Sequence, residues 1–211
     1  MPSALAWKPA MVTKPKRRAP RVTKCGFQVE KTTNDPMFGQ QWGLKNTTLV
    51  GADIAATAAW DYATGGRKTV VAVIDTGVDY THPDLAANIW SAPRSYTFNG
   101  ASGTVTCPAG SHGVNAIAST CTPMDDNGHG THCAGIIGAN GDNTSGVAGV
   151  NWTASILPLK FLSNNGSGNL SDALRAMDAV VQIKKQFPAE ANIRVVSASW
   201  GFVGNSQALD T

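Results

Sequence analysis

The feature that most constrains the fold is a run of β-branched and small apolar residues at 69–74, with the sequence TVVAVI. The run shows no alternation of apolar and polar residues, which is typical of a strand covered on both faces in a parallel sheet. Asp75-Thr76-Gly77 ends the run abruptly. The sequence therefore predicts a buried parallel strand with a carboxylate at its carboxyl end.

Helices and strands are predicted to alternate along the rest of the chain. In order they are helix 54–62, strand 69–74, helix 129–139, strand 155–161, a helix after the turn at 164–166, and strand 193–199. Residues 93–127 are interpreted as a long polar connection. Such alternation implies an α/β fold with a doubly wound, mostly parallel sheet, helices on both faces and right-handed connections.

Local signals set the expected limits and faces of two helices. Asp53 suits the N-cap of the first helix, and Gly65-Gly66 suits its C-cap. In the last helix, Pro188 marks the end, and apolar residues at i, i+4, i+7 and i+11 predict the face that packs in the core. This stripe consists of Leu170, Leu174, Met177 and Val181.

Composition and charge indicate one folded domain preceded by a basic segment. The chain has 211 residues, of which 42% are apolar and 15% charged, and it contains no apolar run long enough for a membrane span. Of the 17 Lys and Arg residues, seven lie in residues 1–24 with no acidic residue, which leaves 10 against 14 acidic residues in the remainder. We interpret residues 1–33 as a basic leader or pro-region remnant that is disordered. The run at 14–18 has no interleaved aromatic residue, so we expect no nucleic-acid partner.

The four cysteines do not indicate a disulfide scaffold in a chain of this length. Cys107 and Cys121 bracket a Gly- and Ser-rich loop, and they could be bridged in an oxidising compartment or remain reduced thiols. Cys133 lies in an apolar helical stretch and is expected to be a buried free thiol. Cys25 has no evident partner.

The candidate chemistry comes from Asp75 and His129. A carboxylate directly after a buried strand is desolvated, so it needs a hydrogen-bond donor that can become positive. His129 follows Asn127-Gly128 and opens a predicted helix, whose positive end favours the neutral imidazole. We predict an acid–base couple in which Asp75 stabilises the imidazolium that forms when His129 accepts a proton. Such a site lies beyond the carboxyl ends of parallel strands.

Two sequence blocks resemble the first two active-site blocks of the subtilases, a family of serine endopeptidases. The blocks are VIDTGVDYTHPDL at 73–85 and NGHGTHCAG at 127–135, in the family's order and spacing. The resemblance runs from about residue 34 to the end, about five-sixths of the chain. It implies the N-terminal part of a subtilisin-like peptidase domain over 34–211, with Asp75 as orienting acid, His129 as general base and His132 as a structural helix residue.

The resemblance also implies where a polypeptide substrate binds. The segment Ser199-Trp200-Gly201 resembles the one that lines the primary specificity pocket of the family. Gly166-Ser167-Gly168 resembles the strand that flanks the bound peptide on its other side. An extended peptide can add to exposed backbone as a further strand, with pockets for its side chains.

A structural calcium ion is a further expectation from the resemblance. The loop at 140–147 is rich in oxygen donors, and together with two distant aspartates it resembles the family's strong calcium site. The expected ligands are Asp35, Asp84, Asn143 and Val147. The alternative for this loop is a simple polar turn.

The family's serine lies in a block of the type Gly-Thr-Ser-Met-Ala, and no Gly-Thr-Ser occurs in this sequence. We therefore expect the serine and the oxyanion-hole asparagine beyond residue 211, a sheet that is incomplete at its C-terminal end, and a segment that is inactive alone. The parent protein is expected to be secreted or vesicular, although residues 1–13 show no secretory signal. The sequence leaves substrate preference and oligomeric state open.

Two other functions remain as alternatives at this point. One is a truncated, non-catalytic peptide-binding module. The other is a metal-dependent hydrolase with zinc bound by His129, His132, Cys133 and either Asp125 or Asp126, since these ligand types and spacings are permissible for zinc.

Overall fold

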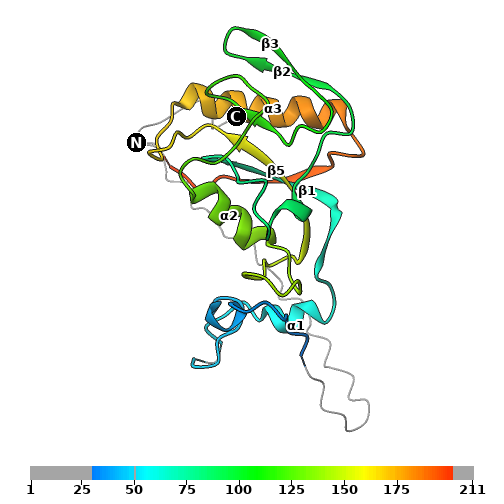
Figure 1. Cartoon of the computed structure of the whole chain (residues 1–211), viewed down its shortest axis with the longest axis vertical. Helices are drawn as coiled ribbons and strands as arrows, with labels where there is room; N and C mark the ends of the chain where they lie inside the picture. Colours follow the sequence, from blue (N-terminus) through cyan, green and yellow to red (C-terminus); the bar gives the residue numbers. More distant parts are fainter. Residues whose placement is uncertain (1–29, 50, 202–211) are drawn as a thin grey trace, which may run out of the picture.

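The computed structural model describes residues 30–49 and 51–201, and the basic run at 14–18 and Cys25 lie outside these residues. Figure 1 shows the arrangement of the elements. The helices are η1 (Phe38–Gln40), α1 (Ala56–Trp60), η2 (Ala86–Asn88), α2 (His129–Gly138) and α3 (Leu170–Gln186). The strands are β1 (Gly65–Asp75), β2 (Tyr96–Gly100), β3 (Gly103–Cys107), β4 (Val114–Asn115), β5 (Thr153–Lys160) and β6 (Ile193–Ser197). No helix in the described part of the chain is both long and apolar enough to cross a membrane.

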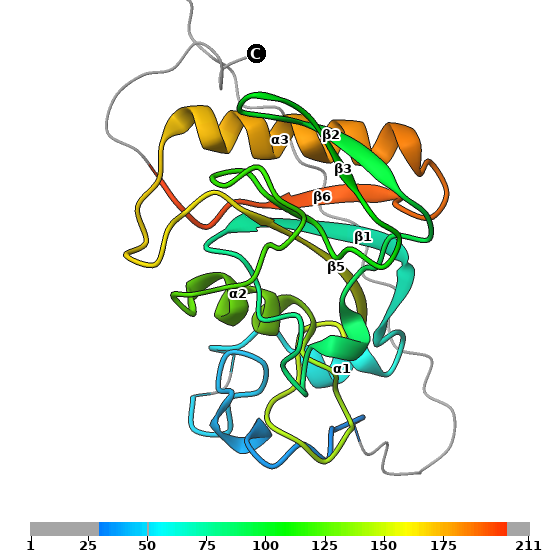
Figure 2. The ribbon, with the colours of Figure 1, turned by 45° about the horizontal axis from the view of Figure 1, so that its top comes forward.

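A parallel sheet with the strand order β4-β5-β1-β6 forms the centre of the fold. Helix α3 covers one face of this sheet and α2 covers the other, as Figures 1 and 2 show. In the register of β1 and β5, Asp75 lies opposite Lys160, so both side chains belong to the carboxyl edge of the sheet. The predicted α/β fold with a parallel sheet and helices on both faces is confirmed.

The two faces of β1 explain why its sequence lacks an apolar and polar alternation. Val70, Ala72 and Ile74 belong to the core between the sheet and α3. Val73 instead packs with Ala134 of α2 in a second core on the opposite face. Because both faces of the sheet are covered, the side chains of β1 enter an apolar core whichever face they point to.

The limits predicted for the first helix are wrong. Helix α1 is shorter than 54–62, and its N-cap is Ala55, which has a left-handed φ of 53°. Asp53 accepts hydrogen bonds from the N–H groups of Ala55 and Asn46, so its carboxylate closes the preceding turn and does not cap the helix. Gly65-Gly66 begin β1 and do not end the helix.

The predicted core face of the last helix is also wrong. The apolar residues that α3 buries are Ala173, Ala176, Ala179, Val180 and Ile183. The side chain of Val181 is 47% exposed, and Leu170 and Met177 pack only at the margin of the core. Small residues let the helix axis approach the sheet closely, so the alanine face is buried and the stripe of larger residues lies beside it.

Residues 93–127 contain structure that the polar composition concealed. Strands β2 and β3 form an antiparallel hairpin that packs against α3, with Tyr96 and Phe98 buried in the core. The short strand β4 extends the main sheet beyond β5. A disulfide joins Cys107 at the end of β3 to Cys121 and so closes the loop between these two residues.

Candidate active site

The carboxylate of Asp75 and the imidazole of His129 are in direct contact. Asp75 Oδ1 lies 2.7 Å from His129 Nδ1, and it also accepts the N–H of Thr76. The side chain of Asp75 is 1% exposed, whereas that of His129 is 48% exposed. Because a carboxylate can only accept hydrogen bonds, Nδ1 carries the proton and Nε2 is left as a proton acceptor on the open side.

Helix α2 approaches the end of β1 because a glycine lies at the contact. The N–H of Gly130 donates to Thr76 Oγ1 at 2.9 Å. A Cβ at Gly130 would lie 2.0 Å from the carbonyl oxygen of Gly77, so a larger residue would push the helix away. This contact brings His129, at the start of α2, beside Asp75, at the end of β1.

Asp125 organises the turn that leads into α2. Its carboxylate accepts the N–H groups of Asn127, Gly128 and Thr131, and the hydroxyl of Thr76. Burial of the carboxylate opposes its ionisation, but these hydrogen bonds outweigh that effect and lower the pKa of Asp125 to about 2. Asp125 therefore joins the start of α2 to the end of β1 in its ionised form.

We expect Asp125→Asn to flatten the dependence of Tm on pH in the acid range. The lowered pKa means that ionised Asp125 stabilises the fold above about pH 4, and that this stabilisation is lost as the pH falls towards about 2. At pH 6 the variant should lose about 1–3 kcal/mol, because an amide replaces the charge and one of the two acceptor oxygens that these N–H and O–H groups need. Thermal melts at several pH values test this, with Asp178→Asn on the exposed surface of α3 as the control. Equal slopes for wild type and Asp125→Asn between pH 4 and pH 2 would contradict the assignment.

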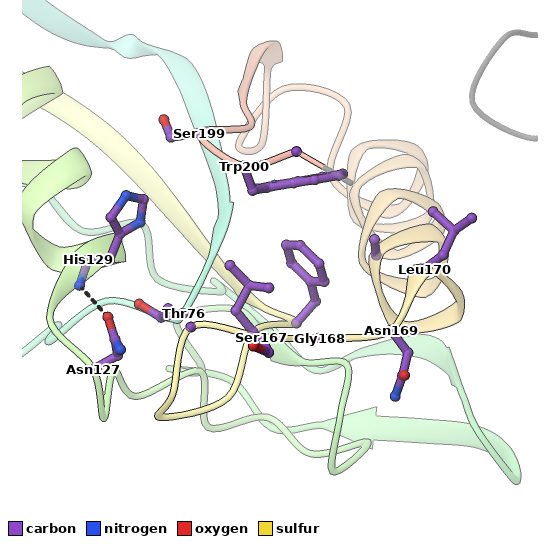
Figure 3. Close-up of a pocket in the computed structure, with 14 residues that line it drawn as sticks. Thr76, Asn127, His129, Ser167, Gly168, Asn169, Leu170, Ser199 and Trp200 are labelled. Carbon is purple, nitrogen blue, oxygen red and sulfur yellow. Dashed lines mark hydrogen bonds between the residues drawn. The ribbon is translucent and has the colours of Figure 1, made fainter. Parts of the chain in front are cut away.

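A pocket of about 500 Å³ extends from His129 along the carboxyl edge of the sheet. The six predicted substrate-binding residues all line it, and they are Gly166, Ser167, Gly168, Ser199, Trp200 and Gly201. In Figure 3, His129 lies at one end and Leu170 at the other, with Trp200 and Ser167 on opposite sides. The structure thus brings the two predicted peptide-flanking segments together beside the imidazole. Their binding role stays a prediction.

Trp200 is fixed to the end of β1. Its Nε1 donates to the carbonyl oxygen of Ile74 at 2.8 Å, and its ring packs edge-on against Phe161 at a centroid distance of 4.7 Å. The indole is therefore held in place beside Ile74 and forms an apolar wall of the pocket.

The loop at 140–147 closes around two buried carboxylates. Asp35 is 4% exposed and Asp84 is 2% exposed. Asn143 donates its backbone N–H to Asp35 at 3.0 Å and its side-chain amide to Asp84 at 2.9 Å, while the N–H of Val147 donates to Asp84 at 2.9 Å. Within residues 30–49 and 51–201, neither aspartate forms a salt bridge. Both carboxylates thus accept N–H groups of the loop, and their oxygens are of the kind that a hard cation such as Ca²⁺ prefers as ligands.

Comparison with known proteins settles the family. The model of the subtilase family matches residues 66–211. The chain belongs to the subtilase family. A thermophilic serine proteinase from Bacillus sp. (strain AK1) is 35% identical to this subtilase over 176 residues, which are 83% of this chain and 35% of that protein. An extracellular protease from Xanthomonas campestris pv. campestris is 36% identical over 186 residues, 82% of this chain and 30% of that protein.

The solved structure of sphericase has the same fold, with a TM-score of 0.54 and 28% identity. The match covers 80% of this chain and 46% of the sphericase chain. This subtilase chain spans about a quarter to a half of the length of the curated relatives that it matches.

The ligand set considered for zinc is not assembled in this subtilase. His132 lines other pockets, together with Ile136, and Asp126 pairs with Lys160. Cys133 was predicted to be a buried thiol, but it is only half-buried. Its Sγ lies 4.0 Å from His129 Nδ1. Among the residues described, Asp75, His129 and Cys133 are the one group of three whose ligand atoms lie within 4.8 Å of one another.

Several residues of the pocket were not predicted from the sequence. Phe161, Leu162 and Ala173 form its apolar side, and Thr76 and Asn127 lie near His129. A signal for the first two existed, because strand 155–161 was expected to end at the same edge of the sheet as Asp75. Ala173 carried no such signal, because it was not assigned to the buried face of its helix.

Proposed function

We propose that this chain carries the acid and the base of a serine-type endopeptidase that hydrolyses peptide bonds through an Asp-His-Ser triad. The observation that carries this proposal is the 2.7 Å contact between the buried carboxylate of Asp75 and the half-exposed imidazole of His129. The contact occurs at one end of a pocket that is open to an extended peptide. Membership of the subtilase family supports the same reaction.

The proposal gives a role to each of the two side chains, which their geometry supports. Asp75 holds the proton on Nδ1 of His129, so Nε2 can accept the proton of a serine hydroxyl as that oxygen attacks the scissile carbonyl. The imidazolium then gives this proton to the leaving amine, and an acyl-enzyme remains. In the second half of the reaction, His129 takes a proton from a water molecule whose oxygen attacks the acyl carbon, and it returns this proton to the serine oxygen as the bond to the acyl group breaks and the carboxylic acid leaves. The serine would be supplied by sequence in the family's Gly-Thr-Ser form, which this chain does not contain.

The substrate of the proposed enzyme is an extended polypeptide. The segments at 166–168 and 199–201 lie on either side of the pocket, and their backbones offer edges to which a peptide strand can add. Trp200, Phe161 and Leu162 make the pocket apolar beyond His129. These features support preference for apolar side chains near the scissile bond.

Calcium and an extracellular or vesicular location belong to the same proposal. Asp35, Asp84, Asn143 and Val147 would hold the ion, which would neutralise the two buried carboxylates. The disulfide between Cys107 and Cys121 supports an oxidising compartment. The name of the Xanthomonas campestris relative, an extracellular protease, supports secretion.

The test is to express the full reading frame and to measure hydrolysis of a fluorogenic peptide together with labelling by a fluorophosphonate. We expect hydrolysis and stoichiometric labelling of a serine, and neither for residues 1–211 expressed alone. Hydrolysis that is blocked by a zinc chelator and leaves the serine unlabelled would overturn the proposal in favour of metal-dependent chemistry. A full reading frame without a reactive serine, whose product binds peptides unchanged, would favour a binding module.

A further inference from the structure

A buried lysine lies beneath the candidate active site. Lys160 is the last residue of β5, where it pairs in register with Asp75 of β1. The residue is 4% exposed, and an ammonium group at this depth is desolvated. Lysine is almost never fully buried unless its ammonium group is paired. The hydrogen-bond partners of Lys160 therefore indicate its role.

The ammonium group of Lys160 joins the end of its own segment to two others. Its Nζ donates to the carbonyl oxygen of Thr76 at 2.6 Å, to the carbonyl oxygen of Leu162 at 2.8 Å and to Asp126 Oδ1 at 2.7 Å. Three acceptors match the three donors of an ammonium group. Each acceptor lies next to a functional part of the site: Thr76 follows Asp75, Leu162 lines the pocket, and Asp126 belongs to the turn before His129.

We propose that Lys160 is a positioning residue, which holds the end of β1 against the wall of the pocket in the arrangement that lets Asp75 contact His129. The inference rests on the proposed function and adds to it a residue that touches neither substrate nor reacting atoms. The ammonium group acts through the backbone: it fixes the peptide that follows Asp75 relative to the peptide at Leu162 in the wall of the pocket.

The two carbonyl contacts carry this role more than the ion pair does. The side chain of Asp126 is 55% exposed, so its attraction to Lys160 is screened by solvent and is worth little. The bonds to the carbonyl oxygens of Thr76 and Leu162 are buried. Removing the ammonium group would deprive both oxygens of a hydrogen bond, which carries a desolvation cost. A displacement of about 1 Å in a catalytic group can reduce the rate about a hundredfold.

Lys160→Met in the protein expressed from the full reading frame tests the proposal. We expect kcat to fall about 10- to 100-fold, with KM changed less than about threefold, because most residues that line the pocket lie on segments that Lys160 does not hold, whereas the couple is misaligned. In NMR spectra, the low-field signal of the His129 Nδ1 proton should shift or broaden. Asp126→Asn, which leaves both carbonyl contacts in place, should change kcat less than about threefold.

Lys184→Met is the matched control. Lys184 also donates its Nζ to a backbone carbonyl oxygen, that of Ile193, at 2.8 Å, but on α3 and away from the pocket. Wild-type kcat and an unchanged His129 signal in Lys160→Met would overturn the proposal, as would equal losses in Lys160→Met and Lys184→Met. If Lys160→Met does not fold, Lys160→Arg keeps the charge with different geometry. It should lower kcat about tenfold, and a wild-type kcat there would also overturn the proposal.

The NMR signal separates this inference from the proposed function. It reports the contact between Asp75 and His129 whether or not the protein hydrolyses peptides. If wild type shows the signal but no serine-dependent hydrolysis, the proposed function fails while the effect of Lys160→Met on the signal still decides the positioning role.

Discussion

Replacing His129 by alanine in the protein expressed from the full reading frame is expected to lower kcat about 10⁶-fold, the loss known for removal of the corresponding base in subtilisin. The reason is that a serine hydroxyl is a weak nucleophile until a base accepts its proton. Asp75→Asn should cost about 10⁴-fold, because an amide can donate to Nδ1 and so stabilise the tautomer that leaves Nε2 protonated. Hydrolysis of a fluorogenic peptide under saturating conditions measures both losses.

His132→Ala is the matched control for the first prediction. His132 follows His129 on the same helix but does not line the pocket beside His129, so its removal should change kcat less than about threefold. If His129→Ala kept more than a few per cent of the wild-type kcat, or if the two histidine variants lost activity equally, His129 would not be the base.

Removing calcium is expected to lower Tm by about 10 °C. Asp35 and Asp84 are buried without a salt bridge in the described part of the chain, so their mutual repulsion and desolvation would oppose folding when no cation is bound. An ion present at about a thousandfold its Kd stabilises the fold by about 4 kcal/mol. In a protein of this size, each kcal/mol corresponds to about 2–4 °C in Tm.

Calorimetry of the protein expressed from the full reading frame, with calcium and with a chelator, measures this difference. Asp84→Asn should abolish most of the response to calcium, because the variant loses a charged ligand. In the structure this carboxylate accepts hydrogen bonds from Asn143 and Val147 of the loop. Asp178→Asn on α3 should keep the full response. A chelator that leaves Tm unchanged would sink the calcium assignment and leave the loop as a polar turn.

The sequence predicted those parts of the fold whose signal is local and strong. Residues 69–74 indicated a buried parallel strand because β-branched residues follow one another without a polar residue, and β1 contains this run. The contact between Asp75 and His129 could be predicted because Asp75 lies at the end of a strand and His129 at the start of a helix. Both positions are readable from neighbouring residues alone.

Other parts depend on packing partners that no local pattern reveals. The buried face of α3 is made by alanines such as Ala173 and Ala176, whose small size matters only when a sheet lies close by. The β2–β3 hairpin is concealed because its buried residues, Tyr96 and Phe98, alternate with polar ones over a very short span. Lys160, at the end of an apolar strand, reads as a solvent-exposed charge until the register with Asp75 is known.

The site is held by bonds between residues that are far apart in the sequence. The Asp75–His129 bond spans 54 residues, the bond from Lys160 to Thr76 spans 84, and the bond from Trp200 to Ile74 spans 126. Closing such long loops carries a large entropic cost before the contacts form, and it slows folding. A partly folded polypeptide of this kind would therefore hold no aligned Asp75–His129 couple, because the couple forms only once β1 has paired with β5 and α2 has packed on the sheet.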